Sequence, residues 1–156
     1  MLAEPVRLVW FIFSRGETDM ENEFTYAVYS SFLNEHKLLG SRDKKNGAVF
    51  LPPRPLNPQN YSVDMEWLEF SGKGTLEAYT IVYIAPTAMI EEGFDRKNPY
   101  CVGIVKTEEG PMVSAFIKDV DVLHPETIKV GTAVKASFID RGEGEARQSF
   151  LAFQPA

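Results

Sequence analysis

The sequence predicts a mainly β protein, in which one N-terminal helix and a small proline-rich module precede a short barrel of about five strands. Three observations support this fold class. Apolar residues recur at helical spacing near the N-terminus, prolines crowd the stretch after it, and the rest alternates strand-forming segments with glycine and proline turns. We therefore expect an N-terminal extension and helix at 1–40, the module at 41–65 and the barrel at 66–156.

The helix is expected over 19–38. A capping box at 18–21 is typical of a helix start, because a side chain there reaches back to the first free backbone N–H. From Phe24 to Phe32, apolar residues recur every three or four positions and form one stripe. Gly40 then supplies a natural stop.

The module at 41–65 differs in composition from the rest of the chain. It contains a short apolar strand at 48–51, which is followed by Pro52-Pro53-Arg54-Pro55. Proline at this density is incompatible with a helix or a central strand. The module carries four basic residues against two acidic ones, whereas the whole chain carries 16 against 22.

The barrel is predicted from apolar, β-branched and aromatic segments that turns separate. These segments are 66–70, 76–84, 100–105, 112–117, 130–139 and 147–153. About five strands of this length are typical of a Greek-key OB-fold. Gly72-Lys73-Gly74 lacks the remaining residues of a phosphate loop and precedes a strand, so we interpret it as a glycine bend at a barrel corner.

Charge and composition exclude several classes of protein. The net charge of −6 argues against a general DNA binder, which needs Lys and Arg to displace counterions. A single cysteine, Cys101, allows no intrachain disulfide, which favours a reduced, cytoplasmic protein. The apolar run 6–13 is far shorter than the roughly 20 residues of a membrane-spanning helix. We interpret it as a short strand or helical turn that docks on another surface.

Residues that could carry catalysis are sparse. Cys101 lies within a predicted strand, where cysteines are mostly buried and inert. His36 lies near the predicted helix end, where a contact with the helix dipole is its ordinary role. The second histidine, His124, precedes a proline in a loop. No pattern pairs these residues into a nucleophile and a base, so we expect no enzyme activity from the chain alone.

Four polar residues in the module have the spacing of two zinc knuckles. Asp43 and Asn46 are separated by two residues, Asn57 and Asn60 are separated by two, and ten lie between the pairs. Zinc prefers thiolate and imidazole ligands, and a neutral amide is a poor ligand. Taken alone, these residues are ordinary turn formers. We therefore expect no bound metal.

Beyond these patterns, several motifs occur together and in order over about 20–156. They are Asn46-Gly47, Pro52-Pro53-Arg54, Asn57-Pro58-Gln59-Asn60, Ser71-Gly72-Lys73-Gly74, Tyr79-Thr80-Ile81-Val82, Pro99-Tyr100 and Gly131-Thr132-Ala133-Val134. In this series of motifs the chain resembles a family of acyl-CoA-associated proteins, which was long catalogued as a domain of unknown function. Its members join an N-terminal helix, a rubredoxin-like zinc ribbon and a C-terminal OB-fold. It departs from them at the four cysteine positions, so the ribbon is expected to have lost its zinc.

The resemblance implies a function. Such proteins accompany thiolases, hydroxymethylglutaryl-CoA synthases and related enzymes of CoA thioesters, so we expect a noncatalytic accessory or scaffold subunit that binds CoA or acyl-CoA. Cations and aromatic rings would receive the phosphates and the adenine. The residues we would test are Arg54, Lys44, Lys45, Lys73, Tyr79 and Tyr100. Each has an ordinary alternative role as a solvated charge or a core ring.

Two other functions stay open, a nucleic-acid-binding OB-fold module and a free-standing acyl-CoA or lipid carrier. OB-fold barrels bind single strands through basic grooves and stacking aromatics. Against this, 66–156 carries 14 acidic and 9 basic residues. The sequence leaves open whether the chain associates with itself.

Overall fold

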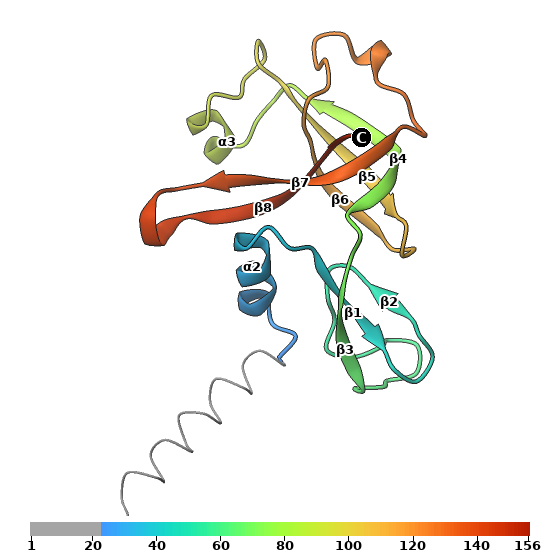
Figure 1. Ribbon diagram of the computed structural model, residues 1–156. Coiled ribbons are helices and arrows are strands. Elements are labelled where there is room, and N and C mark those ends of the chain that lie inside the picture. The colour runs from blue at the N-terminus through green and yellow to red at the C-terminus, as the bar shows by residue number, and fades with distance from the viewer. Residues whose placement is uncertain (1–22) are drawn as a thin grey trace, which may run out of the picture.

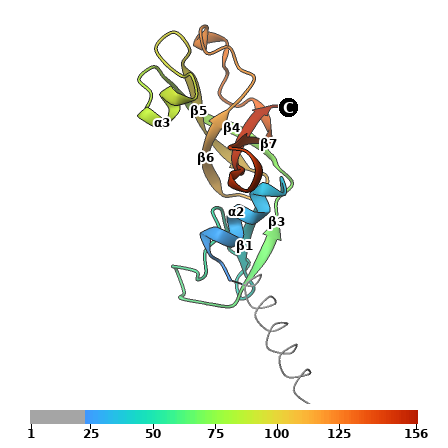
Figure 2. The same cartoon turned by 90° about the vertical axis from the view of Figure 1, so that its left-hand side faces the viewer.

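The computed structural model describes residues 23–156. The capping box at 18–21 and the apolar run 6–13 therefore lie outside the described residues. Figures 1 and 2 show a small sheet and a barrel arranged end to end, with helix α2 at their junction. In the described part of the chain, no helix is long and apolar enough to cross a membrane.

Helix α2 spans Tyr26–Asn34. Its first turn is capped by Thr25, whose Oγ1 accepts a hydrogen bond of 3.3 Å from the backbone N–H of Val28. The prediction that the helix runs to residue 38 was wrong. The chain leaves the helix four residues earlier, and His36 adopts a left-handed backbone with a φ of 58°, which no continuing helix permits.

Gly40 does not stop the helix but lies inside strand β1, Leu39–Asp43. A Cβ atom at this position would collide with the carbonyl oxygen of Phe50 and with the ring of Phe70. The glycine is therefore required because neighbouring groups pack tightly against the strand, and this requirement is invisible in a local pattern.

The small sheet has the antiparallel order β2-β1-β3, with β2 at Val49–Phe50 and β3 at Met65–Glu69. The ring of Trp67 in β3 contacts two aromatic side chains that precede it in the sequence. Phe24 stacks on its ring at 4.6 Å, and Phe32 of α2 meets it edge-on at 5.1 Å. These contacts attach α2 to the sheet.

The second half forms a closed barrel with the strand order β4-β5-β6-β8-β7, which confirms the predicted five-stranded OB-fold. Its strands are β4 Lys73–Val82, β5 Tyr100–Thr107, β6 Met112–Ile117, β7 Ala133–Arg141 and β8 Gln148–Pro155. Three short helices lie in its loops, α3 Thr87–Glu91, η1 Pro125–Thr127 and η2 Gly144–Ala146. The segment 66–70, which we expected in the barrel, instead pairs with β1 as strand β3.

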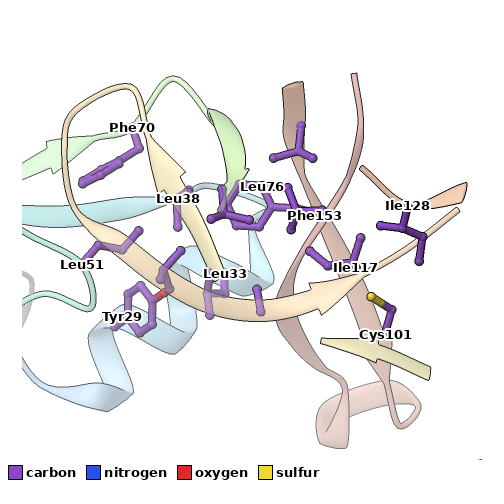
Figure 3. Packing of buried hydrophobic residues seen from close by; sticks show 14 residues of the cluster. Tyr29, Leu33, Leu38, Leu51, Phe70, Leu76, Cys101, Ile117, Ile128 and Phe153 are labelled. Carbon is purple, nitrogen blue, oxygen red and sulfur yellow. The ribbon is translucent and has the colours of Figure 1, made fainter. Parts of the chain in front are cut away.

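Gly72 has a φ of 77° immediately before β4, as expected for a glycine bend at the entrance to the barrel. One continuous core then joins both parts of the molecule (Figure 3). Leu76, Ile117 and Phe153 fill the barrel, while Leu33 of α2 belongs to the same buried cluster. The small sheet is thus fixed to the barrel by apolar packing rather than joined by a linker.

Candidate functional site

The four polar residues with knuckle spacing make one tight turn each and lie in two equivalent loops. Each side-chain oxygen accepts a hydrogen bond from the backbone N–H two residues further along. The N–O distances are 2.8 Å for Asp43, 2.9 Å for Asn46, 3.0 Å for Asn57 and 2.9 Å for Asn60. These are Asx turns, and their hydrogen bonds hold the loops in a knuckle conformation.

The backbone repeats the equivalence of the two turns. In the first turn the N–H of Gly47 donates to the carbonyl of Asp43 at 2.7 Å, and in the second the N–H of Tyr61 donates to that of Asn57 at 2.8 Å. Gly47 and Tyr61 both have a left-handed backbone, with φ values of 76° and 56°. The module therefore contains two knuckle-shaped loops of matching backbone conformation.

Asp43 is the centre that joins the turns. Its Oδ2 accepts hydrogen bonds from Asn57 Nδ2 at 2.8 Å and Asn60 Nδ2 at 3.0 Å. Its Oδ1 accepts one from the Ser62 hydroxyl at 3.1 Å. Asp43 and Asn57 are completely buried. We call Asp43, Asn46, Asn57, Asn60 and Ser62 the knuckle cluster.

The surroundings of the Asp43 carboxyl determine its protonation state. Burial raises the pKa of the Asp43 carboxyl, but the hydrogen bonds donated by Asn57 and its neighbours outweigh burial and lower the pKa to about 2. The carboxylate is thus held ionised, and several donors satisfy it. An ionised, fully hydrogen-bonded carboxylate can replace a metal ion as the centre of the cluster.

The knuckle cluster does not fit a zinc ion. Its side chains supply one carboxylate, three neutral amides and a hydroxyl, and the amides of Asn57 and Asn60 direct N–H groups, not lone pairs, at the centre. Among residues 23–156, no three His, Cys, Asp or Glu side chains gather where they could hold a metal. Elemental analysis of the purified protein would test our prediction that no zinc is bound.

The candidate cations of the module lie around this cluster. Lys44 and Lys45 belong to the first knuckle, where Lys44 forms an ion pair of 3.5 Å with Asp64. Arg54 is fixed by its backbone N–H, which donates to Ser41 Oγ at 2.8 Å. Its guanidinium lies 5.6 Å from the centre of the Phe50 ring. The module thus presents its positive charge on a stiff frame.

The candidates in the barrel are placed differently. Lys73 begins β4 and pairs in register with Lys135, away from the knuckles. The Tyr79 hydroxyl donates to the carbonyl of Pro125 at 2.8 Å, and its ring packs against the core. Tyr100 is buried and stacks on Phe116 at 5.5 Å. Both tyrosines already contact other protein groups, so the cations of the module are the better candidates for contacts with CoA.

Sequence reasoning missed a charged junction between α2 and the β7–β8 hairpin. Asp140 accepts hydrogen bonds from Ser149 at 2.5 Å, from His36 at 3.0 Å and from Arg147 at 2.8 Å. The Ser149 and His36 hydrogen bonds, with the charge of Arg147, lower the pKa of Asp140 to about 2. His36 also stacks on Phe138 at 4.9 Å. Because His36 and Asp140 lie 104 residues apart, no local motif could reveal this contact.

Comparison with known proteins gives close relatives. A family described as "ChsH2, C-terminal OB-fold domain" matches residues 67–138. A "DUF35 domain-containing scaffold protein" of Methanothermobacter thermautotrophicus is 37% identical over 123 residues, which cover 78% of this chain and 86% of the relative. A protein of the same description from Pyrococcus furiosus is 38% identical over 104 residues, 67% of this chain and 70% of the relative.

More distant matches extend the comparison. The alpha subunit of a 3-oxo-4,17-pregnadiene-20-carboxyl-CoA hydratase from Mycobacterium tuberculosis is 28% identical over 95 residues, 61% of this chain and 28% of that subunit. The solved structure "Ltp2-ChsH2(DUF35) aldolase" shares the fold with a TM-score of 0.66 and 22% identity, covering 83% of this chain and 92% of that one. With the identities and coverage of the scaffold proteins, these findings show that the chain belongs to the DUF35 family, the OB-fold family that its motifs resemble.

Proposed function

We propose that the chain is a noncatalytic accessory subunit, which holds an enzyme of CoA thioesters and contributes cations to the CoA site of the complex. An accessory, scaffold role agrees with the names of its relatives. One observation supports the noncatalytic part most directly. Cys101 is fully buried inside the barrel, and burial raises the pKa of its thiol to about 11. A protonated, inaccessible thiol cannot act as a nucleophile.

Neither histidine supplies a base for this cysteine. His36 is engaged with Asp140 at the α2 junction. His124 lies in an exposed loop, with its Nδ1 3.4 Å from Glu126. Catalysis by nucleophile and base requires the two groups within hydrogen-bond reach. The chemistry of the complex therefore belongs to the partner.

The proposed partner is an enzyme with a thiolase-like or hydroxymethylglutaryl-CoA-synthase-like fold. Two relatives support partnership with CoA-thioester enzymes in general. One is the alpha subunit of a hydratase of a CoA thioester, and the other is a structure named "Ltp2-ChsH2(DUF35) aldolase". The choice of a thiolase-like fold within that class rests on the family resemblance of the motifs.

CoA would meet this chain at the module, where the local charge is positive. Lys45 and Arg54 have no ion pair among residues 23–156, whereas Lys44 is partly neutralised by Asp64. Arginine suits a diphosphate because its planar fork donates two parallel hydrogen bonds. Arg54 stands between Pro53 and Pro55, so little backbone entropy is lost when it binds.

The test begins with the tagged chain purified from its own cells, together with the CoA-thioester enzyme that accompanies it. Calorimetry with CoA then compares the wild-type complex with Arg54→Ala. We expect a loss of about 1.5–3 kcal/mol, the range for a hydrogen bond to a charged group. Arg96→Ala, which removes an exposed arginine from the β4–β5 loop, is the matched control. Unchanged affinity with a lowered melting temperature would restrict Arg54 to a packing role against Phe50.

A nucleic-acid function is disfavoured by the surface that OB-folds commonly use. That surface is the outer face of the second and third barrel strands, here β5 and β6. Its paired outward positions are Val102 with Phe116, Ile104 with Ser114 and Lys106 with Met112, so Lys106 is the single cation among these paired positions. Phosphate backbones need Lys and Arg on such a face.

A further inference from the structure

A hollow of about 210 Å³ lies between the barrel and the loop 118–132. Its lining is mixed, with apolar atoms from Leu76, Ile117, Ile128 and Val134 and hydroxyl groups from Thr127 and Thr132. The four apolar side chains are buried, and Figure 3 shows Ile117 and Ile128 next to each other at this edge of the core. An apolar cavity of about 150 Å³ already accepts benzene, so this hollow is large enough for one aliphatic side chain.

The rim of the hollow is acidic. Asp119 has a left-handed backbone with a φ of 57°, and no described residue donates a hydrogen bond to its carboxylate or pairs with it. Asp121 adds a second carboxylate, whose Oδ1 accepts the N–H of Leu123 at 3.1 Å. Lys129 is the cation on the rim, and its ammonium donates to the Glu126 carbonyl of its own loop at 3.3 Å. The charge presented to an incoming group is therefore negative.

The loop also exposes apolar side chains beside the hollow. Leu123 is 63% exposed, and Val130, next to the lining residue Lys129, is 59% exposed. A hollow with apolar side chains in a mixed lining, flanked by exposed aliphatic side chains, is typical of a surface that another protein covers. Small-molecule sites, by contrast, are usually enclosed and bury most of their ligand, whereas this hollow is open to solvent.

From these features we infer that the hollow is a docking site for a segment of a partner protein, which inserts an aliphatic side chain next to a basic residue. The aliphatic side chain would contact the apolar part of the lining, and the basic residue would pair with Asp119. This inference rests on the proposed accessory function, since it names the surface through which the subunit holds its partner. The site is separate from the cations of the module.

Two short peptides test the docking site without the enzyme. Acetyl-Gly-Lys-Leu-Lys-Gly-amide and its counterpart with glutamates in place of lysines are titrated into the 15N-labelled full chain and followed by NMR. We expect the basic peptide to shift amide signals within 117–134 and the acidic peptide to leave them unchanged. Equal shifts from both peptides, or none at these amides, would overturn the inference.

Matched variants locate the contacts. Asp119→Asn keeps a residue that tolerates the left-handed backbone, and it should weaken the basic peptide by up to about fivefold, the range for an exposed ion pair. Leu123→Ser with Val130→Ser should weaken it by about tenfold through lost apolar burial. Glu145→Gln and Ile84→Ser remove an equivalent charge and a more exposed apolar side chain elsewhere and should have no effect.

The outcomes separate this inference from the proposed function. If butyryl-CoA shifts the amides of 117–134 and the basic peptide does not, the hollow receives an acyl chain and the docking inference is wrong. If an enzyme copurifies with the Asp119→Asn and Leu123→Ser variants as well as with wild type, the accessory function stands and the docking surface lies elsewhere. If the peptide binds as expected but no CoA-thioester enzyme copurifies, only the proposed function fails.

Discussion

Replacing Asn57 with leucine should destabilise the protein through the knuckle cluster. Asn57 is completely buried, and leucine keeps its branched outline but is larger, so the variant loses the polar contacts and adds crowding to that loss. The hydrogen bond of 2.8 Å from Asn57 Nδ2 to the Asp43 carboxylate is of the charged kind, which contributes about 1.5–3 kcal/mol. The bond of 3.0 Å from the Gln59 N–H to Asn57 Oδ1 adds about 0.5–1.5 kcal/mol.

Together these losses predict that Asn57→Leu lowers the free energy of unfolding by about 2–4 kcal/mol. For a chain of this size the melting temperature should fall by about 4–16 °C. Urea unfolding followed by circular dichroism measures the change, with Gln59→Ala as the control, because that variant keeps the backbone N–H. A change below about 0.5 kcal/mol for Asn57→Leu, the size of an ordinary surface substitution, would refute the view that the cluster holds the ribbon together.

Two further predictions concern the same cluster. Because the folded-state pKa of Asp43 is lowered from 3.8 to about 2, its contribution to stability is complete above pH 3.8 and is lost as the pH falls toward 2. The difference in urea midpoint between wild type and Asp43→Asn should therefore shrink over this range. A difference independent of pH would contradict this prediction. Asp140 titrates in both proteins, so its contribution cancels from the difference. Cysteine in place of Asp43, Asn46, Asn57 and Asn60 should bind one zinc per chain and raise the melting temperature when zinc is added, because the knuckle turns are already formed. Elemental analysis beside wild type measures the zinc, and a variant that stays zinc-free would show that the turns differ from metal-binding knuckles.

The barrel could be predicted from the sequence because its strands are long, alternate in polarity and end at glycine or proline turns. The pairing of 66–70 could not, since a single strand with the right pattern fits either sheet, and its partner β1 is fixed by contacts more than 20 residues away. The end of α2 was likewise set by distant groups, because His36 turns out of the helix toward Asp140. Helical spacing carries no information about such contacts.

The candidate site was predictable only as a spacing. Asp43, Asn46, Asn57 and Asn60 stood at knuckle intervals, but their residue types predicted only separate turns. Only the structure shows Asn57 and Asn60 converging on one buried carboxylate, with Ser62, which lies outside the spacing, as a further donor. Cooperation among buried polar groups depends on their three-dimensional arrangement, which short motifs do not encode.

In the proposed function, this chain assists catalysis by a CoA-thioester enzyme without supplying a catalytic group. The most direct measurement is the turnover of the purified partner enzyme, alone and with added wild-type or Cys101→Ala chain, after circular dichroism has shown that the variant is folded. We predict no turnover from the chain by itself and equal stimulation of the enzyme by both forms. Turnover of a CoA thioester by the isolated chain, or loss of stimulation in the folded Cys101→Ala variant, would contradict the account.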